Sequence, residues 1–147
     1  MLHQSPGLYF EYCPVRYGLT AVKIGICEYG WKAKDRNRRP LTSIRDLLVF
    51  VPLHDRKRRF WLERRLHKLF HRCRISVPQL MFSSPLSVEL FDITAVERFL
   101  NKSGFMPAAF STQGQLIPQI IDPEQMIMAI NGASKRGLPL EPGYLFG

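Results

Sequence analysis

Two short extended segments near the start of the chain constrain its fold more than any other feature. Residues 7–10 read Gly-Leu-Tyr-Phe, and residues 22–26 read Val-Lys-Ile-Gly-Ile. Side chains alternate across a strand, so the apolar residues of the two segments can share one buried face: Leu8, Phe10, Val22, Ile24 and Ile26. We therefore predict a hairpin whose loop is centred near Arg16 and sets Tyr9 opposite Lys23 on the other face. Periodicity alone is also satisfied by an ordinary amphipathic hairpin that happens to carry these two residues.

The length and composition are those of one globular domain. A chain of 147 residues, 46% of them apolar, can form one core with room for a modest appendage. No apolar run is long enough to span a membrane, and we expect no signal peptide, because the first six residues lack a basic start and an apolar stretch. Three cysteines are an odd, sparse set, which favours reduced thiols in a cytoplasmic protein over a disulfide framework.

The excess positive charge is confined to one segment. Residues 32–74 contain fifteen Lys or Arg and four Asp or Glu, a net charge of +11, whereas the rest of the chain has six bases against eight acids. Solubilising surfaces usually mix both signs, so a one-sided segment favours a face that binds a polyanion. Nucleic acid is the expected partner, and acidic lipid is a weaker alternative because no amphipathic anchor accompanies the charge.

Hydrophobic patterning predicts the elements that follow the hairpin. Residues 31–39 are compatible with a short helix, and residues 47–53 form a continuous apolar run typical of a central strand. Residues 57–74 are the best helix, with Asp55 as its N-cap. Its apolar residues form one stripe: Leu62, Leu66, Leu69, Phe70 and Cys73.

The second half of the chain carries weaker signals. Residues 89–93 predict a short strand, and Thr94 with Glu97 fits a capping box that begins a helix ended by Gly104. A last helix begins at residues 122–123, where Asp precedes Pro.

The predicted fold class is therefore α/β: a small mixed sheet led by an N-terminal β-hairpin, with flanking helices. Residues 1–104 would form the main domain. Residues 105–147 are poor in charge and rich in Pro, Gly and Gln, and we expect them to be an accessory segment that packs on the core or forms a homodimer contact.

The order of these motifs resembles the GIY-YIG nuclease superfamily over roughly residues 7–99. Gly7-Leu8-Tyr9 stands where the family has a Gly-Ile-Tyr strand, and Lys23-Ile24-Gly25 where it has a Tyr-Ile-Gly strand. The lysine form is similar to the phage and bacterial branch. The resemblance implies a metal-dependent DNA endonuclease with an Arg on one helix and a Glu on a later one.

The resemblance implies roles for three residues. Tyr9 would assist the attacking water, Arg36 would stabilise charge on the phosphoryl oxygens, and Glu63 would bind Mg²⁺ or Mn²⁺. Arg suits the second role through its fixed, always-charged fork, although Arg38 and Arg39 are close rivals for it. One carboxylate with waters and substrate oxygens suits Mg²⁺, which keeps much of its hydration shell.

Two further residues join this predicted site. Lys23 would favour the phenolate form of Tyr9 by its charge, or would contact phosphate. His67, four residues after Glu63 on the same helix face, would orient that carboxylate or move a proton. The acidic-x-Phe strand of the family branch is matched by Glu89 with Phe91, whereas the family's Asn has no counterpart in this region.

The remaining basic residues would hold the DNA backbone, with RNA as an open alternative. The candidates are Lys32, Lys34, Arg38, Arg39, Arg58, Arg59 and Arg65.

Simpler interpretations of the same residues stay open. Glu63 can be an ordinary surface residue paired with Arg59 or His67. His67, His71 and Cys73 could ligate zinc, although no Cys-x-x-Cys accompanies them. The whole chain could be a binding module that has lost cleavage, or a small phage-type protein that inhibits a nucleic-acid-processing partner.

Overall fold

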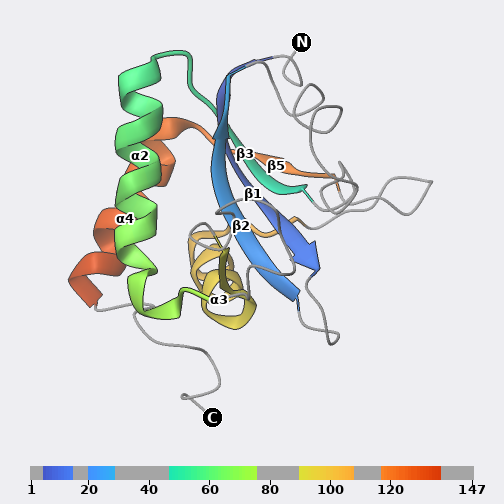
Figure 1. Cartoon of the computed structure of the whole chain (residues 1–147). Coiled ribbons are helices and arrows are strands. Elements are labelled where there is room, and N and C mark those ends of the chain that lie inside the picture. The colour runs from blue at the N-terminus through green and yellow to red at the C-terminus, as the bar shows by residue number, and fades with distance from the viewer. Residues whose placement is uncertain (1–4, 15–19, 29–46, 76–89, 108–116, 137–147) are drawn as a thin grey trace.

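A five-stranded mixed sheet is the centre of the molecule. The computed structural model describes residues 5–14, 20–28, 47–75, 90–107 and 117–136. The strands are β1 (Gly7–Pro14), β2 (Thr20–Cys27), β3 (Leu47–Pro52), β4 (Leu90–Asp92) and β5 (Gln119–Ile120), in the order β4-β2-β1-β3-β5. Only the β3–β5 pair is parallel among these strands. The helices are α2 (Arg56–Leu69), α3 (Ile93–Ser103) and α4 (Pro123–Arg136), with a 3₁₀ turn, η4, at His71–Cys73. All three helices lie on one face of the sheet (Figure 1), so the predicted α/β class is confirmed.

The β1–β2 hairpin has the predicted faces but not the predicted register. Leu8, Phe10, Val22 and Ile24 are buried in the main core, with Ile26 packed against it. Tyr9 pairs with Gly25 rather than with Lys23, because the strands extend to Pro14 and Thr20 and the centre of the connection moves by one residue from Arg16. A shift of two positions keeps every side chain on its own face, so the hydrophobic pattern cannot distinguish the two registers.

A bulge in β3 divides its side chains between two apolar clusters. The pairing with β1 shifts between Phe10 and Glu11, and Leu48 is the residue that the ladder skips. Leu48 and Val49 therefore both join the main core under the helices. Leu47 and Phe50 lie on the opposite face of the sheet, where they form a second buried cluster with Tyr9 and Cys27.

The basic helix is shorter than predicted but keeps its apolar stripe. The Asp55 side chain accepts a hydrogen bond from the Arg58 backbone N–H, which confirms the predicted N-cap. The α-helix ends at Leu69 rather than at residue 74, and the tighter η4 turn follows it. This turn still directs Phe70 and Cys73 into the core, so all five residues of the predicted stripe are buried.

The start of α3 differs from the prediction in its capping residue. Asp92, not Thr94, is the N-cap, and its side chain accepts from the Ala95 backbone N–H. Glu97 instead accepts a hydrogen bond from the Tyr12 hydroxyl of β1. A tertiary partner has therefore replaced the local bond of the predicted capping box. The helix ends at Gly104, which has φ of 74°, as predicted.

The segment after residue 104 takes part in the same core. β5 pairs with the central strand β3, and α4 begins at Pro123 as predicted. Met126, Ile130 and Ala133 of α4 are buried in the main core. This part of the chain therefore packs on the sheet in the single protomer, and its role in a homodimer stays a prediction.

Candidate active site

A hydrogen bond from His67 attaches α2 to the hairpin. His67 Nε2 donates to the backbone carbonyl of Ile24 over 2.9 Å, and the ring lies tilted against Phe91 with centroids 5.1 Å apart. Ile24 directly follows Lys23, the last β2 residue that pairs with β4. Because the carbonyl can only accept, the Nε2 nitrogen carries the proton and Nδ1 is left for other partners.

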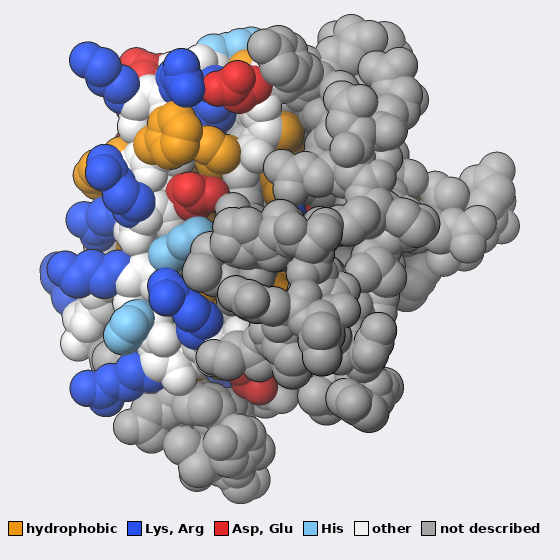
Figure 2. Space-filling model, in the orientation of Figure 1, with side chains coloured by type: hydrophobic (Ala, Val, Ile, Leu, Met, Phe, Trp, Pro, Cys, Tyr) orange, Lys and Arg blue, Asp and Glu red, His pale blue; other side chains and the backbone are white. Residues whose placement is uncertain are grey.

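Glu63 lies one helical turn before His67 on the same flank of α2. It is half-buried and is the single acid in a helix that contains seven Lys or Arg. Figure 2 shows Lys and Arg side chains gathered along α2, with acidic, histidine and hydrophobic side chains among them. Because residues four apart share a helix face, the His67 anchor holds the Glu63 flank of α2 against β2.

Tyr9 and Lys23 contact each other on the opposite face of the sheet. The Lys23 Nζ lies 5.7 Å from the Tyr9 ring centroid, a diagonal contact between neighbouring strands. Both side chains are only 1% exposed. Glu11, directly opposite Lys23 in the register, is buried on the same face. The predicted Tyr–Lys pair is therefore present, but it lies in a closed environment rather than on an outer face.

The structure thus brings the predicted catalytic residues together in two pairs. Tyr9 and Lys23 lie on the sheet face away from the helices, whereas His67 binds β2 from the helix side, with Glu63 one turn earlier on α2. Along the sequence the two pairs are close, because Tyr9 pairs with Gly25 and His67 binds the carbonyl of the preceding residue. In space they lie on opposite faces of the sheet. Arg36 lies outside the described residues.

The predicted DNA contacts divide by exposure. Arg59 is 4% exposed, and its Nη1 donates to the carbonyls of Leu53 and His54, so its guanidinium is engaged within the protein. It occupies the buried side of α2 and ties the helix to the preceding loop. Arg58 is exposed and forms an ion pair with Glu124 of α4 at 2.7 Å.

Arg65 is the third α2 residue of that predicted set. Its guanidinium bonds Asn131 of α4 and lies over the Trp61 ring. The other predicted contacts lie outside the described residues: Lys32, Lys34, Arg38 and Arg39.

Three residues near the site were missed by the sequence reasoning. Glu11 continues the alternation that places Tyr9 on its face, so a period of two could have identified it. Phe60 and Trp61 are exposed aromatic residues on α2, and their signal was a pair of large apolar residues outside the apolar stripe.

The described residues contain no group of three His, Cys, Asp or Glu that could hold a metal ion. Cys73 is buried in the core and His67 binds Ile24, so these two residues of the zinc alternative do not face one site. A magnesium ion needs fewer protein ligands, because it retains several waters. The half-buried carboxylate of Glu63, beside a helix face rich in phosphate-attracting cations, fits such an ion.

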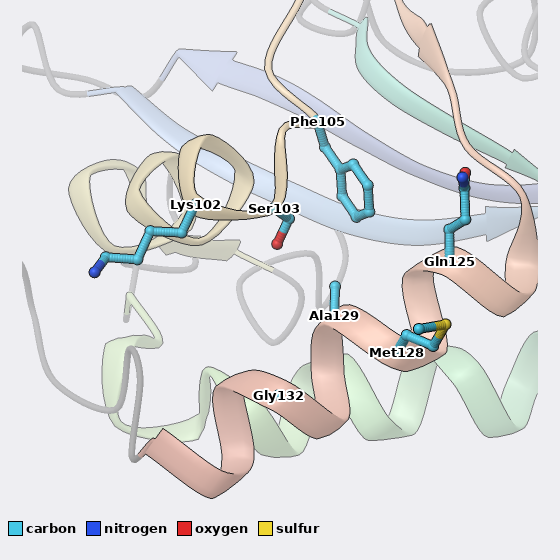
Figure 3. Close-up of a pocket in the computed structure, with 7 residues that line it drawn as sticks. All are labelled: Lys102, Ser103, Phe105, Gln125, Met128, Ala129 and Gly132. Atoms are coloured by element: carbon cyan, nitrogen blue, oxygen red, sulfur yellow. The ribbon is translucent and has the colours of Figure 1, made fainter.

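A shallow hollow of about 350 Å³ lies apart from these residues, between the end of α3 and α4. It is lined by Lys102, Ser103, Phe105, Gln125, Met128, Ala129 and Gly132. Figure 3 shows the Phe105 ring directed toward α4 and the Lys102 side chain pointing away from it. The hollow has no carboxylate or imidazole, so it does not resemble a hydrolytic site.

Comparisons with protein-family models, with curated proteins and with solved structures find no match to this chain. None of the described helices is long and apolar enough to cross a membrane.

Proposed function

We propose that this chain is a metal-dependent DNA endonuclease of the GIY-YIG type that hydrolyses phosphodiester bonds. Two features support this function: a hairpin that carries Tyr9 beside Lys23, and a basic helix that carries a single acid, Glu63. The observation that carries most weight is the bond from His67 to the Ile24 carbonyl. It holds the acidic flank of the basic helix against the strand that pairs with Tyr9.

Each residue has a distinct role in the proposed hydrolysis. Tyr9 would position the attacking water and accept its proton, and the nearby charge of Lys23 would favour the phenolate. Glu63 would hold Mg²⁺ or Mn²⁺, which when bound supplies charge neutralisation at the phosphate. His67 would fix the rotation of α2 and so position the Glu63 carboxylate. Arg36 would stabilise the charge that develops on the phosphoryl oxygens.

A plasmid-nicking assay tests this function directly. Purified protein with Mg²⁺ should convert supercoiled DNA to the nicked form, and both Tyr9→Phe and Glu63→Gln should lower the rate by at least about 100-fold. Glu124→Gln is the matched control, because Glu124 is an exposed helix acid paired with Arg58. It should cut at the wild-type rate. Cleavage that survives in the Tyr9 and Glu63 variants would exclude this site.

A second candidate is a nucleic-acid-binding module that keeps the fold without cleavage. The burial of Tyr9 and Lys23, each 1% exposed, favours it, because a catalytic phenol must reach water and phosphate. Binding to DNA or RNA with no cut under any divalent ion would establish this second function. A chain that bound neither nucleic acid at moderate salt would instead fit the inhibitor alternative.

A further inference from the structure

The outward face of α2 combines a row of cations with two exposed aromatic rings. Lys57, Arg64 and Lys68 are exposed and are spaced by seven and four residues, so they form one row along the helix. Phe60 and Trp61 lie on either side of this row, and they are 38% and 39% exposed. Figure 2 shows hydrophobic side chains among the Lys and Arg side chains over α2.

An arginine one turn away lies against each aromatic ring. The Arg56 guanidinium is 5.6 Å from the Phe60 ring centroid, and that of Arg65 is 5.2 Å from the Trp61 ring centroid. Both arginines have a second partner, since Arg56 lies 3.3 Å from a Glu28 carboxylate oxygen and Arg65 bonds an α4 side chain. Each ring is therefore partly exposed at the surface with a guanidinium against it.

We propose that this face binds unpaired nucleotides, so that the chain takes nucleic acid with a single-stranded segment. In a duplex the bases are stacked inside, and only the cation row would find partners on the phosphates. A single strand offers both components: phosphates for the row formed by Lys57, Arg64 and Lys68, and open base faces for Phe60 and Trp61. Where the proposed nuclease function holds, this inference names its substrate class. The binding itself does not depend on cleavage.

Fluorescence of Trp61 tests the stacking without any chemistry. The chain has two tryptophans, so Trp31→Phe leaves Trp61 as the single emitter. In EDTA, addition of a short oligothymidine should quench this emission, whereas a hairpin duplex of equal charge should quench it little. The same titration with an oligouridine of equal length shows whether the face prefers single-stranded RNA or single-stranded DNA.

Binding constants of variants separate stacking from charge. Phe60→Leu and Trp61→Leu keep an apolar side chain but remove the ring, and each should weaken single-strand binding between about fivefold and 100-fold. Duplex binding should change less than about twofold. The matched control, Lys57→Gln, should weaken binding of the single-stranded and duplex ligands alike. It should also reduce the magnitude of the slope of log K against log salt by about 0.7 to 0.9. Thermal melts of all three variants exclude unfolding as the cause.

The outcomes distinguish this inference from the proposed function. Equal losses for single-stranded and duplex ligands in the leucine variants, or no loss in either, would overturn the stacking role even if duplex plasmid is nicked. Quenching and selective loss in EDTA, together with no nicking in Mg²⁺, would retain the single-strand face and overturn the nuclease.

Discussion

The bond from His67 to the Ile24 carbonyl makes a prediction that separates positioning from proton transfer. His67→Gln keeps a nitrogen donor at the same number of bonds from the backbone, so it can still reach the Ile24 carbonyl. His67→Ala removes the donor and the ring together. We expect the glutamine variant to stay close to wild type in stability and the alanine variant to lose much more.

The magnitude follows from the two contacts of the ring. Loss of a hydrogen bond that leaves a carbonyl unpaired costs about 1–3 kcal/mol. The tilted contact with Phe91, at 5.1 Å between centroids, is worth about 0.5–1.5 kcal/mol beyond its buried area. His67→Ala should therefore lower the free energy of unfolding by about 2–4 kcal/mol, and His67→Gln by about 1 kcal/mol. For a chain of this length the alanine variant should lose about 10 °C in Tm.

Urea denaturation measures both losses, and His71→Ala is the control, since His71 is an exposed histidine on the η4 turn. It should change the free energy of unfolding by less than about 0.5 kcal/mol. Nicking assays across pH then separate the roles of His67. If His67 positions α2, the glutamine variant should keep its nicking activity and the pH profile should be unchanged. If His67 transfers a proton, both the glutamine and the alanine variants should lose nicking activity. A glutamine variant as unstable as the alanine variant would refute the importance of the hydrogen bond.

Three further predictions concern the scaffold. Gly7→Ala should lower the free energy of unfolding by about 2 kcal/mol or more, because a Cβ there would lie 2.4 Å from a β3 backbone oxygen. Gly104→Ala has nothing within 4 Å of the added Cβ and should lose only about 1 kcal/mol, from the strain of its φ of 74°. Equal melting temperatures of the two variants would contradict this prediction. Arg59→Gln should lower the free energy of unfolding, measured by urea denaturation, by about 2 kcal/mol, because the Arg59 side chain is buried and donates to backbone carbonyls. Its neighbour Arg58→Gln should lose less than about 1 kcal/mol, because Arg58 is exposed. Similar losses in the two variants would argue against a structural role for Arg59. Burial and the Glu97 carboxylate raise the pKa of Tyr12, so the unfolded chain ionises this phenol at lower pH than the folded chain does. The free energy of unfolding of the wild type should therefore fall above pH 10 more steeply than that of Tyr12→Phe. Parallel curves of unfolding free energy against pH would exclude this linkage.

Part of the candidate site was predictable because it depends on local periodicity. Alternation along the two strands places Tyr9 and Lys23 on one face, and the helical period places Glu63 beside His67. The surroundings of these side chains, and so their burial, were not predictable from the sequence. The second apolar cluster that buries the Tyr9 ring includes Leu47 and Phe50, which come from a strand distant in sequence.

The amino-acid sequence by itself determined the class of fold, the buried stripe of the basic helix and the segregation of positive charge, since each follows from the order of neighbouring residues. The helical period also places Arg59, three residues before Leu62, on that stripe, although it does not give the carbonyls of Leu53 and His54 that the guanidinium binds. Only the tertiary structure decided the hairpin register and the partner of Glu97. Those outcomes depend on where distant backbone carbonyls and hydroxyls lie, and a local pattern carries no information about that.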